Sequence, residues 1–250
     1  MSSGGFQDHF SARAPGYSTY RPTYPHRLFE WLGERCVAHD TAWDCATGSG
    51  QAALGLAHLF RHVIATDASA AQIEHAKHAP NVEYRVAPAE RSGLPDGAVD
   101  CVTVAQALHW LDRPRFYDEA RRVARPGAVV AVWMYNLMRV DPAVDRVIDR
   151  LYHEVVGPWW PGNRALVDGE YRDIDFPFAA IEPPPFEMAG DWDLAHLTGY
   201  LRTWSAVTRC TAATGRDPIA EVEPELRAAW GAPDRIRAVH WPLFVRVGRR

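Results

Sequence analysis

Apolar and polar positions alternate in two different ways along the chain, and the change falls near residue 136. Between residues 41 and 135, apolar runs of strand length are separated by amphipathic stretches, which is typical of βα units on a parallel sheet. This pattern predicts strands over residues 42–46, 62–66, 82–86, 99–105 and 128–135. It predicts helices over residues 25–37, 51–60, 70–78 and 115–123, the first of them ahead of the sheet. The first half of the chain is therefore expected to be α/β.

Beyond residue 136 the pattern predicts helices over residues 144–156, 193–204 and 223–230, separated by segments rich in glycine and proline. Strands are predicted over residues 186–190 and 237–247, and these would close the sheet as an antiparallel pair. Pro242 has no N–H group to donate, so we expect either a bulge at Pro242 or a strand that starts after it. The predicted organisation is an N-terminal lid and helix (1–40), a ligand-binding core (41–136), and a cap with the closing strands (137–250).

Composition limits the kinds of partner that this chain can have. Its 250 residues are 47% hydrophobic, enough to bury one full core at the upper end of a single domain. A net charge of -4, without a long run of one sign, argues against binding to nucleic acid or to an anionic membrane. The four cysteines form no C-x-x-C pair, and no apolar stretch is long enough to span a bilayer. We expect a soluble, cytoplasmic protein with small partners and no metal.

A glycine turn follows the first predicted strand and opens the next helix. Free N–H groups at a helix N-terminus bind polar or anionic groups, and Gly48 and Gly50 allow a ligand to approach the backbone. Asp67 ends the second strand, where a carboxylate can accept both hydroxyl groups of a ribose. The spacing Gly48-x-Gly50-x-x-Ala53 also satisfies the G-x-G-x-x-A fingerprint of NAD-binding proteins. The turn predicts a nucleotide-like ligand and leaves NAD open.

Asp44 favours a different cofactor. The first strand of a dehydrogenase usually runs apolar up to its glycines, whereas this strand carries a carboxylate that needs polar partners if it is buried. Residues 44–50 resemble motif I of class I S-adenosylmethionine (SAM)-dependent methyltransferases, D-x-G-x-G-x-G, with Ala46 in place of the first glycine. This resemblance implies SAM as the cofactor. It also implies a Rossmann-like, mostly parallel sheet with an antiparallel last strand, under a helical cap.

Two further segments carry the same resemblance. Ala89 and Glu90, after the third strand, resemble the adenine-side loop of these enzymes. The Gln-Ala-Leu-His-Trp run at residues 106–110 and the Tyr-Arg-Pro run at residues 20–22 resemble the methyltransferase-11-type subgroup, which includes fungal-type trans-aconitate methyltransferases. With Arg21 expected to pair with the SAM carboxylate through its guanidinium fork, the predicted cofactor-binding residues are Tyr20, Arg21, Asp44, Ala46, Gly48, Ser49, Gly50, Asp67, Ala68, Ala89, Glu90, Gln106 and Ala107.

On the acceptor side the sequence predicts one catalytic candidate, His109. Methyl transfer is an in-line displacement that depends on positioning, and a base is needed only for a protonated nucleophile. His109 is therefore either that base or a residue that orients its loop by a hydrogen bond. Predicted substrate contacts are Trp110, Trp133 and Trp204, for which core packing is the alternative, and Arg202, which would hold a substrate carboxylate.

The sequence therefore predicts SAM-dependent methyl transfer to a small molecule, with a carboxylate or hydroxyl oxygen among the candidate acceptors. Two alternatives stay open at this stage. One is an NAD(P)-dependent oxidoreductase, against which stand Asp44 and the absence of a recognisable Tyr-x-x-x-Lys pair. The other is a module that binds SAM without turnover.

Overall fold

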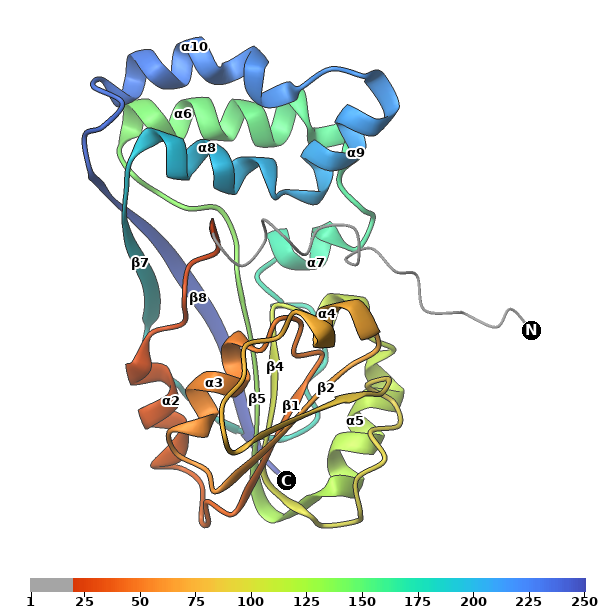
Figure 1. Ribbon diagram of the computed structural model, residues 1–250. Coiled ribbons are helices and arrows are strands. Elements are labelled where there is room, and N and C mark those ends of the chain that lie inside the picture. The colour runs from red at the N-terminus through yellow and green to blue at the C-terminus, as the bar shows by residue number, and fades with distance from the viewer. Residues whose placement is uncertain (1–19) are drawn as a thin grey trace.

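A mixed sheet of eight strands forms the centre of the molecule in the computed structural model, which describes residues 20–250 (Figure 1). The strand order is β3-β2-β1-β4-β5-β8-β6, and β7 also pairs with β8. The strands are β1 (Thr41–Cys45), β2 (His62–Asp67), β3 (Val82–Val86), β4 (Val99–Ala105), β5 (Ala124–Tyr135), β6 (Ala179–Ile181), β7 (Phe186–Trp192) and β8 (Arg237–Arg249). β1 to β5 are parallel, and β8 runs antiparallel to β5, β6 and β7. The predicted fold class is confirmed.

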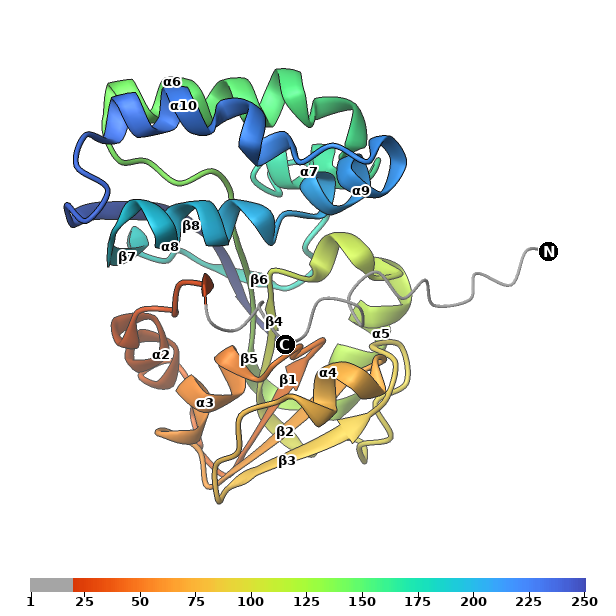
Figure 2. The same cartoon turned by 45° about the horizontal axis from the view of Figure 1, so that its top comes forward.

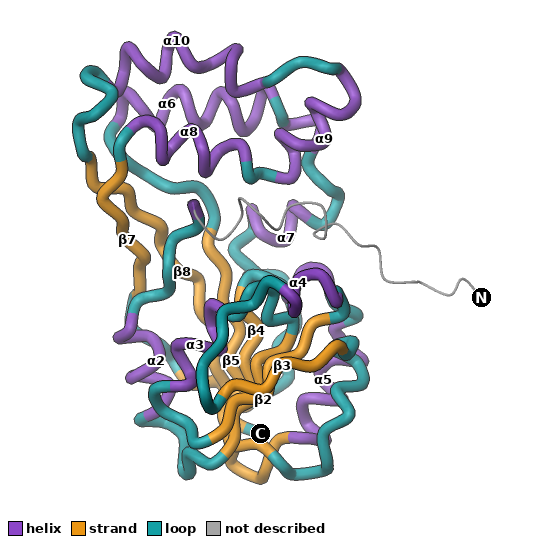
Figure 3. The backbone as a smooth tube through the Cα atoms, in the orientation of Figure 1, coloured by secondary structure: helices purple, strands orange, loops and turns teal. Residues whose placement is uncertain are grey.

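Helices cover both faces of the parallel part, so its central strands are apolar on both sides. Alternate residues along each strand point to opposite faces. Ala42 packs on the face that α2 (His26–Gly33) and α3 (Gln51–Ala57) cover, whereas Trp43 packs with Phe116 of α5 (Arg113–Val123) on the other face. Figure 3 shows α2 and α3 on the side of the sheet away from α5. Short α4 (Ala70–Glu74) follows β2 and ends earlier than predicted.

The prediction of a bulge or a late start at Pro242 is wrong. β8 begins at Arg237, and β7 pairs with it from Arg237 to Leu243 without a shift of register. On the other side of β8 the ladder to β5 begins only at Leu243, one residue after Pro242. A missing N–H group is tolerated where a strand edge has no partner. Pro242 pairs with none of the described strands on that side, and this position accommodates the proline.

The second half of the chain supplies a helical cap over the sheet. Its helices are α6 (Pro142–Arg150), which continues as a π-helical turn (Leu151–Val155), α7 (Arg164–Asp168), α8 (Leu194–Arg202), α9 (Ser205–Thr214) and α10 (Pro218–Trp230). Figure 1 shows α8 and α9 nearer to the sheet than α10, with β7 and β8 running up toward the cap, and Figure 2 shows α6 and α10 side by side above α8. Aspartate side chains accept backbone N–H bonds at the starts of three of these helices, at Asp141, Asp193 and Asp217.

The cap differs from the prediction in two helices and one strand. α7, α9 and β6 were not predicted, and α10 begins at Pro218 rather than near residue 223. Proline is favourable in the first turn of a helix, where its missing N–H group has no intrahelical acceptor. None of the helices within residues 20–250 is long and apolar enough to cross a membrane.

Candidate active site

The turn after β1 is built from residues in the left-handed backbone region. Ala46, Gly48 and Gly50 have φ values of 55°, 56° and 84°. Gly50 has a second reason to be glycine, because a Cβ atom there would overlap the hydroxyl of Tyr84. Ala46 adopts the left-handed conformation without being glycine, at a cost of roughly 1–2 kcal/mol. Strain of this kind is frequent at ligand sites, where the surrounding structure holds it in place.

Asp44 supports this turn from below. Its side chain is completely buried and accepts hydrogen bonds from the hydroxyl groups of Thr47 at 2.5 Å and Thr103 at 2.7 Å. Burial raises the pKa of Asp44 to about 6, and the two hydroxyl bonds oppose that increase. The polar partners expected for this carboxylate are therefore present. Asp44 does not line the cavity beside the turn, so its contact is with the protein rather than with a ligand.

Asp67 is fixed at the end of β2 by backbone N–H groups. One carboxylate oxygen accepts from Gly48 N and the other from Ser69 N, each at 2.9 Å. Ser69 is the N-cap of α4, and its hydroxyl accepts from Gln72 N, so Asp67 is not needed for that role. A carboxylate has about four acceptor positions, and Asp67 lines the adjoining cavity. This geometry suits two adjacent ribose hydroxyl groups.

A cavity of about 970 Å³ runs along the carboxyl ends of β1, β2 and β4. Ligand pockets span roughly 300–1,000 Å³, so this cavity is large enough for a nucleotide-sized cofactor. Most predicted cofactor-binding residues line it: Ala46, Gly48, Ser49, Asp67, Ala68, Ala89, Glu90, Gln106 and Ala107. Three features of this cavity fit SAM. They are the left-handed backbone of the turn, the fixed carboxylate of Asp67 and the open space beside Gly48.

Glu90 lines this cavity from the loop after β3 and has a protein partner. Its Oε1 atom accepts from Asp112 N at 3.2 Å, which ties the loop after β3 to the start of α5. Ala89 is buried beside it and contributes mainly backbone. The loop is therefore held in place before a ligand binds.

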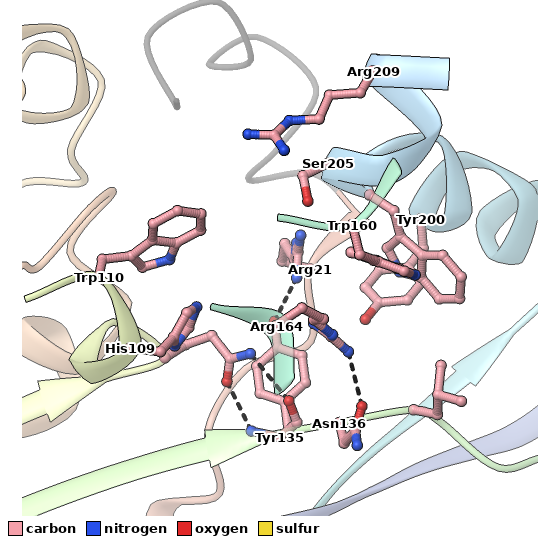
Figure 4. A pocket seen from close by; sticks show the side chains of 13 residues that line it. Arg21, His109, Trp110, Tyr135, Asn136, Trp160, Arg164, Tyr200, Ser205 and Arg209 are labelled. Carbon is pink, nitrogen blue, oxygen red and sulfur yellow. Dashed lines mark hydrogen bonds between the residues drawn. The ribbon is translucent and has the colours of Figure 1, made fainter. Parts of the chain in front are cut away.

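A smaller pocket of about 80 Å³ opens between the large cavity and the cap (Figure 4). It shares Gln106, Trp110, Tyr135 and Arg209 with the large cavity. Gln106 has φ 56° and uses its side-chain amide to bond both the N–H and the C=O of Tyr135, at 2.7 and 3.0 Å. Its amide thus joins the ends of β4 and β5 and is occupied by the protein.

Three guanidinium groups line the small pocket. Arg164 is held by Asn136 at 2.8 Å, by the Tyr152 hydroxyl at 2.5 Å and by Asp168 at 3.3 Å. Arg21 donates to the Tyr135 hydroxyl at 2.7 Å. Arg209 extends from α9 toward the side of the pocket where Trp110 lies (Figure 4).

Aromatic rings form most of the remaining wall. The guanidinium of Arg164 lies 4.4 Å from the ring centre of Trp160, and that of Arg21 lies 5.3 Å from the ring centre of Tyr200. Trp204 packs against Trp160 at a centroid distance of 5.7 Å. Within residues 20–250, no aspartate or glutamate lines this pocket.

His109 lines the small pocket from the short 3-10 helix (Leu108–Trp110) after β4. Its Nδ1 atom lies 2.6 Å from the hydroxyl oxygen of buried Tyr171. Burial lowers the pKa of His109 to about 3, and the positive charges of Arg164 and Arg113 act in the same direction. The imidazole is neutral at physiological pH, and its low pKa favours the alternative of a hydrogen-bonding role over that of a base.

Several predicted residues lie elsewhere. Trp133 is fully buried against Tyr24, so the alternative of core packing holds for it. Arg202 is partly exposed and pairs with Asp217 at 3.1 Å, away from both cavities, so it does not hold a substrate carboxylate. Tyr20 is placed against Gly199 of α8 rather than in a cavity wall.

Sequence reasoning missed several residues of the small pocket, and three of them matter most for its chemistry. These are Arg164 and Arg209 in its wall and Tyr171, which bonds to His109. Arg164 and Tyr171 lie in irregular or very short elements between α6 and β6, where no periodic signal marks them. Arg209 lies on α9, whose one clear signal is Gly215, a left-handed residue at the helix C-terminus.

The sheet order, the glycine turn after β1 and the acid at the end of β2 together define a Rossmann-like methyltransferase fold. Known proteins agree with this class. A methyltransferase domain family matches residues 43–132. Over 252 residues the chain is 32% identical to a candidate methyltransferase of Dictyostelium discoideum, covering 98% of this chain and 96% of that protein. The chain therefore belongs to the methyltransferase family, and this family and its fold imply that the cofactor is SAM rather than NAD.

Solved structures extend the similarity to the whole molecule. A candidate type II methyltransferase from Anaeromyxobacter dehalogenans has 53% sequence identity and a TM-score of 0.86, covering 92% of this chain and 97% of that one. The YcgJ protein from Bacillus subtilis has a TM-score of 0.53 at 15% identity, covering 90% of this chain and 99% of that one, and it supports the fold alone.

Proposed function

We propose that this protein transfers the methyl group of SAM to a carboxylate oxygen of a small organic acid. The observation that carries the proposal is the charge of the small pocket, which is lined by Arg21, Arg164 and Arg209 and by no acidic residue within residues 20–250. Arg164 is paired with Asp168, but Arg209 has no carboxylate partner in that part of the chain. The pocket therefore has positive charge available for an anion.

Electrostatics favour an acid over an amine as the acceptor. A guanidinium is always protonated, and at about 4 Å it interacts with another unit charge by about 4 kcal/mol at an effective dielectric constant of 20. For a carboxylate near Arg209 this energy is favourable, and for an ammonium group it is unfavourable by a similar amount. The same guanidinium fork matches the two oxygens of a carboxylate.

The size of the pocket indicates how the acid is placed. A volume of about 80 Å³ corresponds to roughly three water molecules at about 30 Å³ each, which is enough for a carboxylate and one or two carbon atoms. The rings of Trp110, Trp160 and Trp204 provide an apolar wall for those carbons. Because Trp110 and Arg209 line both spaces, the acceptor would enter beside the cofactor cavity.

Carboxylate methylation also fits the absence of a strong base in the pocket wall within residues 20–250. A carboxylate is ionised at neutral pH and attacks without losing a proton, so the work of the protein is orientation. SAM, when bound, supplies an electrophilic methyl group. We assign its ribose to Asp67, its methionine part to the turn at residues 46–50, and its adenine to the backbone around Ala89. The resemblance to trans-aconitate methyltransferases agrees with an acid substrate but stays a prediction.

Two measurements test the proposal. Calorimetry should show binding of SAM and S-adenosylhomocysteine, and mass spectrometry should find methyl esters after incubation with a panel of mono-, di- and tricarboxylic acids. A parallel panel of amines and phenols serves as the control. Methylation confined to amines or phenols would refute the acid assignment, and binding without any methylated product would favour a non-catalytic module.

A further inference from the structure

The contact between His109 and Tyr171 determines where the imidazole carries its proton. The Tyr171 hydroxyl lies 2.6 Å from Nδ1 of His109, and Tyr171 is only 1% exposed. Within residues 20–250, His109 supplies both polar partners of this hydroxyl, Nδ1 of its ring and its backbone N–H, which can only donate to the phenol oxygen. A phenol has one proton, and a buried O–H group without an acceptor is unfavourable. The hydroxyl therefore donates, and Nδ1 accepts.

This direction fixes the tautomer of the ring. An Nδ1 atom that accepts a hydrogen bond carries no proton, so the proton of the neutral imidazole is on Nε2. The groups that face this ring are Arg164, Arg113 and Tyr171, and the two arginines oppose a second proton. Burial raises the pKa of Tyr171, so the phenol keeps the proton that it donates.

His109 lies in the wall of the small pocket, and its Nε2 atom has no hydrogen-bond partner within residues 20–250. We propose that His109 donates a hydrogen bond from Nε2 to the acceptor carboxylate, and that Tyr171 is the positioning residue that holds this tautomer. The inference rests on the proposed function. The bond goes to the oxygen that is not methylated, because a donor on the attacking oxygen would withdraw electron density from it.

Tyr171 and His109 are both held through their backbones. Glu170 and Tyr171 are consecutive residues with φ values of 56° and 57°, a strained arrangement for side chains of this size. The backbone of Tyr171 is held by its N–H bond to Leu166 O and by Arg246, whose Nη1 atom donates to Tyr171 O, both at 3.0 Å. On the other side, Asn163 donates to His109 O at 3.0 Å. The distance between the two rings is thus set by the surrounding chain.

Nitrogen NMR of the ¹⁵N-labelled full chain tests the tautomer without any substrate. We expect His109 to show an unprotonated Nδ1 and a protonated Nε2 throughout pH 5–8, with its resonances identified by their loss in His109→Gln. A proton on Nδ1, or titration of the ring within that range, would overturn the inference. In Tyr171→Phe the ring should become a mixture of tautomers.

Kinetics of matched variants test the donor role. The amide nitrogen of glutamine can replace the Nε2 donor, whereas leucine cannot. We expect His109→Gln to keep KM for the acid within about three-fold, and His109→Leu to raise it roughly 10- to 100-fold, the effect of a lost bond to a charged group. Binding of S-adenosylhomocysteine should stay unchanged in both.

If both variants lose kcat equally and KM is unchanged, His109 acts otherwise and the donor role is refuted. If Tyr171→Phe fails to fold, the wild-type spectrum still tests the tautomer and the two His109 variants still test the donor role. Failure of the proposed function can be distinguished from failure of the inference about His109. In the first case no acid is methylated, but the tautomer of His109 can still be observed.

Discussion

Asp44→Asn separates the cost of a buried charge from the role of the side chain in the turn. The pKa of Asp44 is about 6 in the folded protein against 3.8 for an ordinary aspartate, so folding raises it by about two units. Each unit corresponds to about 1.4 kcal/mol, which gives about 3 kcal/mol of stability lost when the folded carboxylate ionises.

The sign follows from proton counting. Between pH 3.8 and about 6 the folded chain holds a proton on Asp44 that the unfolded chain has released. Stability therefore falls as the pH rises through this window, and the loss is complete above the folded pKa. The amide in Asp44→Asn has no such titration. Rotation of the Thr47 or Thr103 hydroxyl allows it to accept a bond from the new amide N–H.

Urea unfolding of the wild type and Asp44→Asn at pH 4.5 and pH 7.5 measures this term. The free energy of unfolding of the variant, relative to the wild type, should increase by about 2 kcal/mol between the two pH values, because the range from pH 4.5 to about 6 covers most of the titration window. Asp173→Asn, at an exposed position, serves as the control and should give a difference near zero. A variant-to-wild-type difference that does not change with pH would refute the reasoning. S-adenosylhomocysteine affinity should stay within a few-fold, because Asp44 does not line the cavity.

Three further substitutions test other parts of the site. Asp67→Ala should weaken S-adenosylhomocysteine binding at least ten-fold by calorimetry, since bonds to a charged group are worth about 1.5–3 kcal/mol each; unchanged binding contradicts the ribose assignment. Arg209→Gln should raise KM for the acid about ten-fold, whereas Arg202→Gln, outside the pocket, should leave KM unchanged. Ala46→Gly should raise unfolding free energy by about 0.5–1 kcal/mol, because relief of left-handed strain exceeds the entropy cost of glycine; a lower melting temperature would count against this.

Local sequence was sufficient for the parallel part of the sheet and the turn. β3 and β4 have the predicted bounds, β1 and β2 differ by single residues, and β5 begins four residues earlier than predicted. Each of these strands is a short segment rich in apolar residues that lies between turn-forming residues. The sequence also indicated that Asp44 needs a polar partner. It could not show which one, since Thr103 lies 59 residues away on β4 and is brought beside Asp44 only by strand pairing.

The cap was harder to predict because its helices have weak local signals. α9 carries Thr208, Thr211 and Thr214, and β-branched threonine favours helix less than alanine or leucine. Its buried residues, Ala206, Val207 and Cys210, contribute little apolar contrast. Tertiary packing therefore decides that this segment is helical, and packing is not visible in a single sequence.

One break in the chain explains why Arg209, and not the predicted Arg202, lines the pocket. The two residues are seven apart, so in a continuous helix they would lie on the same face. The structure instead ends α8 at Arg202 and begins α9 at Ser205, and the chain changes direction between them. Arg202 then pairs with Asp217 outside the site, and Arg209 lines the pocket. The positive charge of Arg209, which is proposed to select the acceptor, thus depends on the two-residue junction between α8 and α9. Lengthening or straightening that junction should remove Arg209 from the pocket, while the cofactor turn at residues 46–50 stays intact.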